Sequence, residues 1–249
     1  MKKIKKSLMF ALALLPVAAV AGFFVARYQL ESFDEATIAL LKEQVGSMDV
    51  VVAVSVAQTA LYALVCGFFG HILANKLGLW KPLGIEKAPF LRTVLYSLAG
   101  GVLFSLDKWT FGKWIPEVGA SYEAAITANA WIASVLYGGI IEELMLRLFV
   151  MSLIALILWK VFFRRRETVP AGVVVGANIL AALLFAAGHL PATVTLFGEL
   201  TPLILLRCFL LNGSFGLLFG HLYRKYGIQY AMVSHGLFHI VSKLIWIIF

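Results

Sequence analysis

Three ionisable side chains lie close together in an otherwise apolar stretch, GGIIEELMLRLFV, residues 138–150. They are Glu142, Glu143 and Arg147. A charged side chain at the middle of a lipid-spanning helix costs roughly 2.5 kcal/mol or more, so such residues usually have a function or a named partner. Their types and spacing therefore predict a polar site within the protein.

Helical geometry separates the two glutamates. Glu143 and Arg147 are four residues apart, share one helix face and can form an ion pair with the acid on the favourable N-terminal side. Glu142 is turned about 100° away from Glu143 and has no partner on its own helix. We expect Glu142 to act as a general base or to bind another helix. The alternative is that all three charges only hold helices together.

Three histidines lie in or at the ends of later apolar segments. His189 follows Phe185 by one helical turn, and a lone histidine at a helix end can also serve as a cap. His235, His239 and Lys243 occur at four-residue steps and form one polar face on an apolar helix. Two histidines at this spacing are also typical of metal ligands. This polar face predicts a site between helices.

The composition identifies the kind of protein that must position these residues. The chain has 249 residues, is 61% hydrophobic and only 14% charged, whereas soluble domains have about 25% charged residues. The net charge of +8 comes from basic residues in short loops, with no aromatic-interleaved basic surface for nucleic acid. Cys66 and Cys208 lack CxxC spacing and are expected to be buried apolar residues.

We expect an all-α, polytopic transmembrane helix bundle of about seven spans, with eight as the alternative. A span needs about 20 mostly apolar residues. The third candidate is interrupted by Gly100 and Gly101 and is the least secure. The fourth is too long for one perpendicular span, so it tilts, projects into the cytoplasm, or breaks near the charges. The candidates are residues 7–26, 49–74, 90–106, 129–163, 171–189, 201–223 and 229–249.

The distribution of Lys and Arg predicts the orientation in the membrane. If the N-terminus is cytoplasmic, the inner segments hold fourteen of these residues and the outer segments four. This asymmetry predicts a cytoplasmic N-terminus and an outer C-terminus. We expect a multi-pass protein of a prokaryotic cytoplasmic membrane. The outer four are Arg27, Lys42, Lys108 and Lys113.

The N-terminal region leaves one alternative open. MKKIKK, an apolar run and AVAG resemble a signal peptide cleaved near residue 21, although an uncleaved anchor is favoured by the length of the run. Residues 27–48 are expected to form an outer-surface amphipathic helix, with Ser32 and Glu35 at capping-box spacing. We divide the chain into N-terminal spans with this segment, residues 1–125, and a catalytic core, residues 126–249.

Other intramembrane hydrolytic sites do not fit the sequence. An H-E-x-x-H motif is absent, and no span carries an Asp at mid-depth for an aspartyl dyad. Ser214 lies in NGSFG, but Asn212 occupies the first Gly position of a G-x-S-x-G motif. A site built from Glu and His residues is the remaining kind of intramembrane hydrolytic site.

The chain resembles the CAAX prenyl endopeptidase and bacteriocin-processing (CPBP, or ABI) family of intramembrane proteases. The family motifs are E-E-x-x-x-R, F-x-x-x-H and H-x-x-x-Asn/Asp. Here they read Glu142 to Arg147, Phe185 to His189 and His235 to His239. The resemblance covers about residues 126–249, and the last position departs from it, because a His replaces the family's Asn or Asp.

The resemblance implies an intramembrane endopeptidase that cleaves a membrane-associated protein or peptide. Glu142, assisted by His189, would deprotonate a water, and His235 and His239 would stabilise the oxyanion. The supporting positions are Glu143, Arg147 and Phe185. In a metal-dependent version, a Zn²⁺ ion would be held by Glu142, His189, His235 and His239.

Two hypotheses that give the protein a different function stay open. One is a non-catalytic scaffold, immunity or regulatory protein of the same family, and the other is a transporter that uses the Glu/His cluster as a proton relay. The expected partners are a peptide or protein substrate and the lipid bilayer, without nucleic acid. The sequence does not determine the oligomeric state.

If His189 and His235 belong to one site, they must lie at the same depth in the membrane. At 1.5 Å per residue, His189 lies about 28 Å from the start of its helix, whereas His235 lies only about 9 Å along the last one. The fifth helix must therefore begin below the membrane and stop within it. Residues 190–200 would then line a water-filled cavity.

Overall fold

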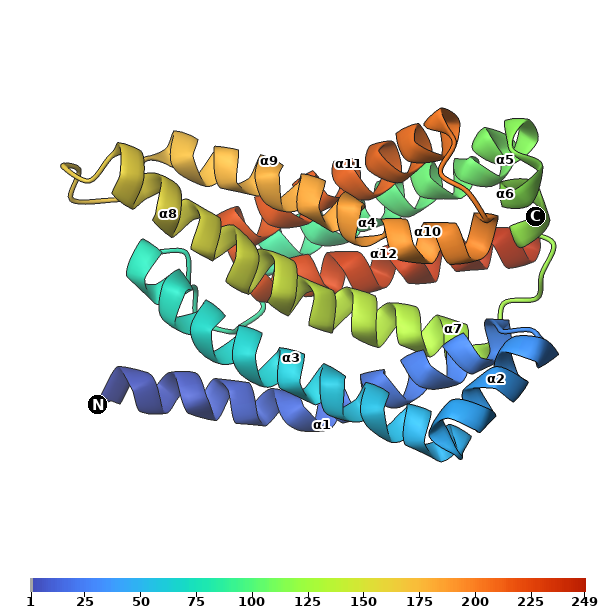
Figure 1. The fold of residues 1–249 in the computed structure, drawn as a ribbon. Coiled ribbons are helices and arrows are strands. Elements are labelled where there is room, and N and C mark those ends of the chain that lie inside the picture. The colour runs from blue at the N-terminus through green and yellow to red at the C-terminus, as the bar shows by residue number, and fades with distance from the viewer. Residues whose placement is uncertain (1) are drawn as a thin grey trace.

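The structure, a computed structural model, describes residues 2–249, and Met1 lies outside the described residues. The described chain is all helical and contains no strand (Figure 1). Seven helical segments are long and apolar enough to cross a membrane. The expected helix bundle is therefore confirmed, and the chain is a multi-pass membrane protein. The segments are Ile4–Ser32, Met48–Leu77, Lys87–Trp114, Ala128–Phe162, Ala171–Phe197, Pro202–Tyr226 and Ile228–Ile248.

The helices follow one another through short connections. The first half contains α1 (Lys2–Ser32), α2 (Glu35–Val45), α3 (Met48–Leu77), α4 (Lys87–Ser105), the 3₁₀ turn η1 (Leu106–Trp109), α5 (Phe111–Trp114) and α6 (Pro116–Ser121). The second half contains α7 (Ala128–Ala133), η2 (Ser134–Glu142), η3 (Leu144–Met151), α8 (Ser152–Phe162), α9 (Ala171–Gly188), α10 (Leu190–Phe197), α11 (Pro202–Tyr226) and α12 (Ile228–Ile248).

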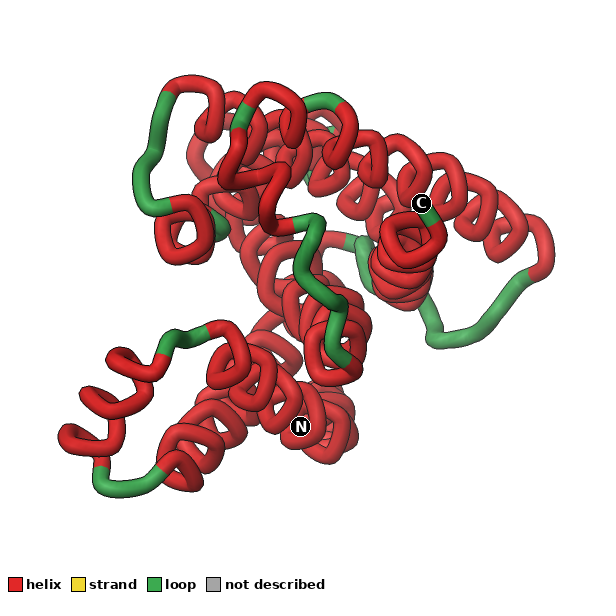
Figure 2. Tube along the Cα trace, turned by 90° about the vertical axis from the view of Figure 1, so that its right-hand side faces the viewer, coloured by secondary structure: helices red, strands yellow, loops and turns green. Residues whose placement is uncertain are grey.

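The fourth span is a central rod made of α7, η2, η3 and α8. It contacts α1 and α3 on one side and α9 and α12 on the other (Figures 1 and 2). Of the three possibilities left open for this long segment, a break is excluded, because the helix continues through the charged motif. Its backbone there is π-helical in η2 and η3, a geometry that is rare and is frequently found at functional sites.

Glycine and alanine allow α1 and α3 to pack closely. Ala18 and Ala63 are fully buried, and the Ser55 hydroxyl donates to the Gly22 carbonyl across 2.9 Å. A Cβ atom at Gly22 would lie only 2.8 Å from both the Ser55 carbonyl oxygen and the Val56 Cα. Small residues that let backbones approach are a main source of helix association in membranes.

Close packing at small residues also explains the glycines of the third span, whose assignment from the sequence was the least secure. Helix α4 runs unbroken through Gly100 and Gly101. Both glycines face α12, since a Cβ at Gly101 would lie 2.7 Å from Val241, and one at Gly100 would lie 3.4 Å from Phe238. The glycines are therefore packing positions and not an interruption.

Helix α2 corrects the expected amphipathic segment at residues 27–48. Residues up to Ser32 continue α1, and α2 begins only at Glu35. The cap is Asp34, whose carboxylate accepts a 2.7 Å hydrogen bond from the Thr37 amide, and this bond lowers the pKa of Asp34. Ser32 instead donates to the Gln29 carbonyl inside α1. The Ser32–Glu35 capping box was wrong because a carboxylate one residue before α2 is already the cap.

Arg207 has a buried partner at the end of the bundle that carries α5, α6 and α10. Its Nε lies 3.0 and 2.9 Å from the two carboxylate oxygens of Asp107. The Tyr122 hydroxyl also donates to Asp107. Burial and then the Asp107 charge raise the pKa of Tyr122, so this hydroxyl stays protonated as a donor. These contacts join η1, α6 and α11.

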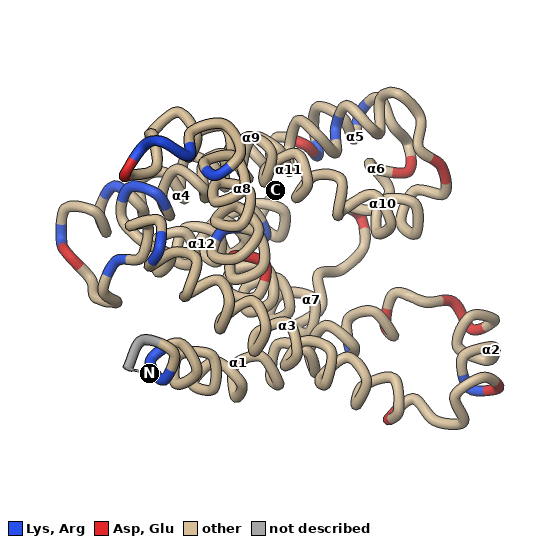
Figure 3. Tube along the Cα trace, turned by 60° about the vertical axis from the view of Figure 1, so that its left-hand side comes forward, with Lys and Arg blue, Asp and Glu red and all other residues tan. Residues whose placement is uncertain are grey.

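The charged residues are unevenly distributed between the two ends of the bundle. Lys and Arg gather around the N-terminus, the α3–α4 connection and the α8–α9 connection, whereas acidic residues mark the opposite end near α2 and α6 (Figure 3). The α8–α9 hairpin extends beyond the turn between α11 and α12 at the basic end (Figure 1). The start of α1 reaches about as far toward this end as α8 does (Figure 1), so tilt and projection into the cytoplasm both stay predictions.

Replacing Gly22 with Ala is expected to weaken the contact between α1 and α3. The added methyl group meets backbone atoms that cannot rotate away, and overpacking of this kind costs about 1–3 kcal/mol. Thermal unfolding in detergent should show a lower midpoint for Gly22→Ala than for the wild-type chain. Gly176→Ala is the matched control, because nothing lies within 4 Å of its Cβ position. An equal midpoint for both variants would contradict the prediction.

Candidate active site

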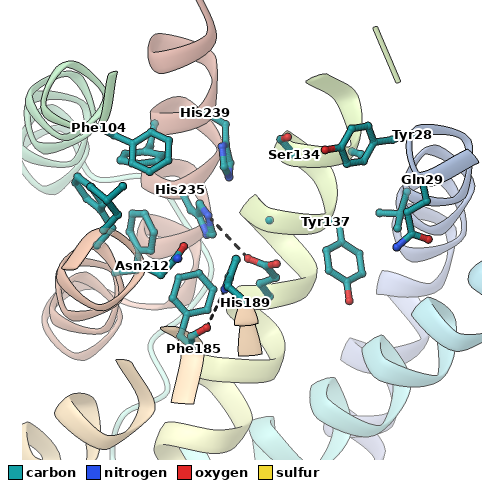
Figure 4. Close-up of a pocket in the computed structure, with 18 residues that line it drawn as sticks. Tyr28, Gln29, Phe104, Ser134, Tyr137, Phe185, His189, Asn212, His235 and His239 are labelled. Carbon is teal, nitrogen blue, oxygen red and sulfur yellow. Dashed lines mark hydrogen bonds and ion pairs between the residues drawn. The ribbon is translucent and has the colours of Figure 1, made fainter. Parts of the chain in front are cut away.

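A cavity of about 300 Å³ lies between α1, η2, α9, α11 and α12 (Figure 4). Its walls bring together the four residues singled out from the sequence, which are Glu142, His189, His235 and His239. These residues come from η2, the end of α9, and α12. The tertiary structure therefore places all three motifs around one space.

Behind the cavity wall, Glu143 is fully buried between two partners. Its Oε1 lies 3.3 Å from Nη1 of Arg147 and 2.9 Å from Nδ1 of His235. The Glu143 and Arg147 side chains are 0% and 1% exposed. The pairing predicted from their four-residue spacing is present, and it also includes a residue of α12. Glu143 thus fixes the position of the His235 ring.

Arg147 connects the central rod to two further helices. Its Nη2 donates to the Gly216 carbonyl of α11 across 3.1 Å. Its guanidinium carbon lies 4.4 Å from the centre of the Phe185 ring on α9 and 5.6 Å from that of Phe219 on α11. A Cβ at Gly216 would lie 3.1 Å from Nη2 of Arg147. Gly216 therefore leaves space for the arginine, beyond the role in helix packing expected from the sequence.

Glu142 points the other way, into the cavity. Its side chain is 19% exposed, and its Oε2 lies 4.0 Å from Nε2 of His235. It is the one carboxylate among the described residues that line the cavity. The two adjacent glutamates are thus in different environments, because Glu143 is enclosed by protein and Glu142 can contact water and ligand.

The two histidines of α12 are stacked on each other and on Phe219. The ring centres of His235 and His239 are 4.9 Å apart, and those of His235 and Phe219 are 4.3 Å apart. Gly138 faces both imidazoles, because its Cβ position lies 3.0 Å from Nε2 of His239 and 3.4 Å from Nε2 of His235. A side chain at 138 would compete with the histidines for the same space.

His189 is placed by the end of α9. Helix α9 ends at Gly188 with His189 as its cap residue, and the His189 Nδ1–H donates to the Phe185 carbonyl across 2.8 Å. The start of α9 extends beyond the α11–α12 turn (Figure 1), and this offset brings His189 and His235 to one cavity. That the fifth helix begins below the membrane and stops within it stays a prediction. Residues 190–200 were predicted wrongly as the cavity lining. Residues 190–197 form helix α10, and none of residues 190–200 lines the cavity.

The arrangement offers no metal centre among the described residues. No group of three His, Cys, Asp or Glu side chains is placed to hold an ion. Nδ1 of His235 is bonded to Glu143 and Nδ1 of His189 to the Phe185 carbonyl, so Nε2 of each ring is the nitrogen left for a ligand. Because the described side chains are not gathered around one point, they do not form a metal site as placed, and we derive no step through one.

Sequence reasoning missed several residues of the cavity. Tyr28 and Gln29 of α1 lie on the wall opposite the histidines, together with Tyr137 of η2 (Figure 4). Asn212 also lines the cavity, while its Nδ2 donates to the Cys208 carbonyl. Tyr137 precedes Glu142 by five residues, close to one turn of a π-helix, and this spacing could have indicated it.

The fold and this site define a helical membrane protein with a buried Glu–Arg–His cluster and a cavity lined by one further Glu and three His. Residues 124–241 match the family model described as type II CAAX prenyl endopeptidase Rce1-like. Over this region, just under half of the chain, the sequence is similar to the CPBP family of protease-type hydrolases. None of the curated proteins and none of the solved structures gives a significant match to the chain.

Removing Arg147 alone should be more harmful than replacing the whole ion pair. Arg147→Met leaves the Glu143 carboxylate buried without its cation, which typically costs about 3–5 kcal/mol. Glu143→Gln combined with Arg147→Met removes both charges and keeps an amide oxygen to accept from His235. Thermal unfolding in detergent should therefore show a higher midpoint for the double variant than for Arg147→Met. A lower midpoint for the double variant would mean that charge burial is not the dominant cost.

Proposed function

We propose that this protein is an intramembrane endopeptidase that hydrolyses a peptide bond of a membrane-associated protein or peptide. The observation that supports this proposal is the position of Glu142. Its carboxylate faces the cavity, and its Oε2 lies 4.0 Å from Nε2 of His235. A water molecule that donates a hydrogen bond to the Glu142 carboxylate can give up that proton to it. The family match supports a protease-type hydrolase.

In the proposed reaction, Glu142 accepts a proton from the water while the water oxygen bonds to the carbonyl carbon of the scissile peptide. The carbonyl oxygen then carries negative charge in a tetrahedral intermediate. Transfer of the proton from Glu142 to the peptide nitrogen allows the C–N bond to break, and an acid and an amine are released. His189, with its Nδ1–H given to the Phe185 carbonyl, presents Nε2 as a second proton acceptor.

Stabilisation of the oxyanion is assigned to the α12 histidines. His235 donates its Nδ1–H to Glu143. For His235 to stabilise the oxyanion, its Nε2 must carry a hydrogen as well, because both ring nitrogens are donors only in the charged imidazole. His239 lines the same wall and occupies the position where the family has Asn or Asp. An imidazole N–H can donate to the oxyanion as an Asn amide does, so the substitution keeps a donor at this point. Preorganised donors of this kind are typically worth about 2.7–4 kcal/mol each.

Glu143 and Arg147 act as positioning residues in this proposal. They hold His235 and Phe185 in place and have no exposed atom for the substrate. The partners are a peptide or protein substrate and the surrounding lipid. The competing proposal is a non-catalytic scaffold of the same family, which would use the same buried cluster only for packing.

Glu142→Gln should abolish proteolysis and leave the fold intact. The amide has nearly the same shape but cannot accept the proton from water. Comparative proteomics of membrane peptides should show fragments in cells with the wild-type chain that are missing with Glu142→Gln. Glu123→Gln is the control, because Glu123 is an exposed acid outside the cavity. Unchanged fragments and phenotype in a folded Glu142→Gln protein would favour the scaffold.

Purified wild-type and Glu142→Gln proteins test whether the reaction depends on a bound metal ion. We expect no stoichiometric metal and no loss of proteolysis with chelators, because in the proposed reaction Glu142, assisted by His189, activates the water without an ion. One bound zinc per wild-type chain, lost together with activity on chelation, would replace this mechanism by metal-assisted hydrolysis.

Gly138→Ala tests whether the placement of the histidines matters. Its methyl group would displace the His239 and His235 rings by a few tenths of an ångström or more. Misplacement of catalytic groups by about 1 Å can cost on the order of 100-fold in rate. We expect fragment production to fall roughly 10- to 100-fold, whereas Gly213→Ala, with nothing within 4 Å of its Cβ position, should retain wild-type production. Equal production by both variants would argue against the assigned roles.

A further inference from the structure

The turn that follows α8 places three consecutive arginines beside exposed apolar side chains. Residues 161–163 are all large and apolar, and between 43% and 70% of the surface of each is exposed. Residues 164–166 are all arginine and are also exposed. Exposed apolar side chains of a membrane protein face lipid chains, so this change from apolar to basic residues indicates the level of the lipid headgroups.

Three hydrogen bonds fix the shape of this turn. The Phe163 amide donates to the Trp159 carbonyl and the Arg166 amide donates to the Phe163 carbonyl, each across 2.9 Å. The Trp159 Nε1–H donates to the Arg166 carbonyl across 3.3 Å, and Trp159 is only 7% exposed. The arginines are therefore carried by a turn that is anchored to a buried ring. A turn that is already ordered loses less entropy when it binds a ligand.

Residues 161–166 surround a pocket of about 400 Å³. Its walls combine the apolar side chains of residues 161–163 with the three arginines. A guanidinium group matches the geometry of a phosphate, because it presents paired N–H donors. A pocket with anion-binding groups beside an apolar surface fits a ligand that is itself both anionic and apolar.

The three guanidinium groups have no protein partner that would compete with such a ligand. Within the described part of the chain, none of them forms a hydrogen bond or an ion pair. Even Glu167, the next residue along the chain, is not within 4.0 Å of them. Other basic residues at this end do have partners, since Lys81 donates to the Lys225 carbonyl and Arg92 to the Tyr226 hydroxyl. Three adjacent positive charges without a counter-charge favour the binding of an anion.

From these observations we propose that residues 161–166 bind an anionic phospholipid of the surrounding membrane. The arginines contact its phosphate, and residues 161–163 contact the adjoining part of its acyl chains. Lys160, one helical turn before Arg164, adds a fourth basic side chain. Clusters of this size directly beyond a membrane-spanning helix are typical of anionic-lipid recognition. This lipid site is separate from the cavity at Glu142 and does not depend on proteolysis.

The alternative is that these arginines only set the orientation of the chain in the membrane. That role needs positive charge at this end but neither an ordered turn nor a pocket. Other basic residues at the same end can therefore serve as a matched control. Lys5, Lys76 and Lys87 are exposed there, and replacing them with Gln removes the same amount of charge.

Native mass spectrometry of the purified full chain in detergent tests the proposal. The lipid probes are phosphatidylglycerol and phosphatidylcholine with identical acyl chains, and inorganic phosphate is the competitor that lacks acyl chains. The test variant combines Arg164→Gln, Arg165→Gln and Arg166→Gln. The control variant combines Lys5→Gln, Lys76→Gln and Lys87→Gln. Thermal unfolding confirms that each variant is folded.

We expect the wild-type chain and the lysine variant to bind phosphatidylglycerol roughly tenfold more tightly than phosphatidylcholine. The arginine variant should bind phosphatidylglycerol roughly 10- to 100-fold more weakly than the wild-type chain, because each basic residue near a membrane surface contributes to anionic-lipid binding. Equal binding of the two lipids by the wild-type chain would overturn the proposal. Equal phosphatidylglycerol binding by the two variants would overturn it too, because only net charge would then matter.

Two further results complete the test. Displacement of phosphatidylglycerol by an equal concentration of inorganic phosphate would also contradict the proposal, because the ligand would then be the free anion and not a lipid. If the arginine variant does not fold, Arg165→Gln alone replaces it, and this single change should weaken phosphatidylglycerol binding several-fold. Unchanged binding by Arg165→Gln would count against the site in the same way.

Discussion

The buried carboxylate of Glu143 lies between the guanidinium of Arg147 and the imidazole of His235, and the arrangement of four helices depends on it. A charge inside a membrane protein is tolerated only with partners, because its desolvation is expensive. Arg147 supplies the opposite charge and extends to the Gly216 carbonyl of α11 and the Phe185 ring of α9. His235 adds α12. One buried, paired charge thus sets the relative positions of η2–η3, α9, α11 and α12.

The pairing of Glu143 with Arg147 and His235 explains why Glu142 is available for catalysis. Because Glu143 already meets the electrostatic needs of Arg147, Glu142 is not required for the buried pair and can face the cavity. Glycine completes the arrangement. Gly138 leaves space for the two histidines of α12, and Gly216 leaves space for Arg147. The glycines at these positions act by having no side chain, and no special backbone angle is involved.

Local rules failed where a contact from another helix decided the outcome. Gly100 and Gly101 suggested an insecure span, but α12 packs against them and the helix continues. Ser32 has capping-box spacing, yet α1 extends through it and Asp34 caps α2. The partner of Arg207 is a buried carboxylate one hundred residues earlier, which no local spacing indicates. The division at residue 125 stays a prediction.

The sequence by itself determined the helical membrane class, the seven spans, the Glu143–Arg147 pair and the three motifs, because apolar length and four-residue spacing are local properties of a helix. It also predicted that the fifth span begins below the membrane and stops within it, which stays a prediction. Only the tertiary structure decided that His235 bonds to Glu143 and faces Glu142, that α1 supplies one wall with Tyr28 and Gln29, and that residues 190–197 form a helix away from the cavity. These features depend on how helices from distant parts of the chain pack, and no spacing along one helix specifies that.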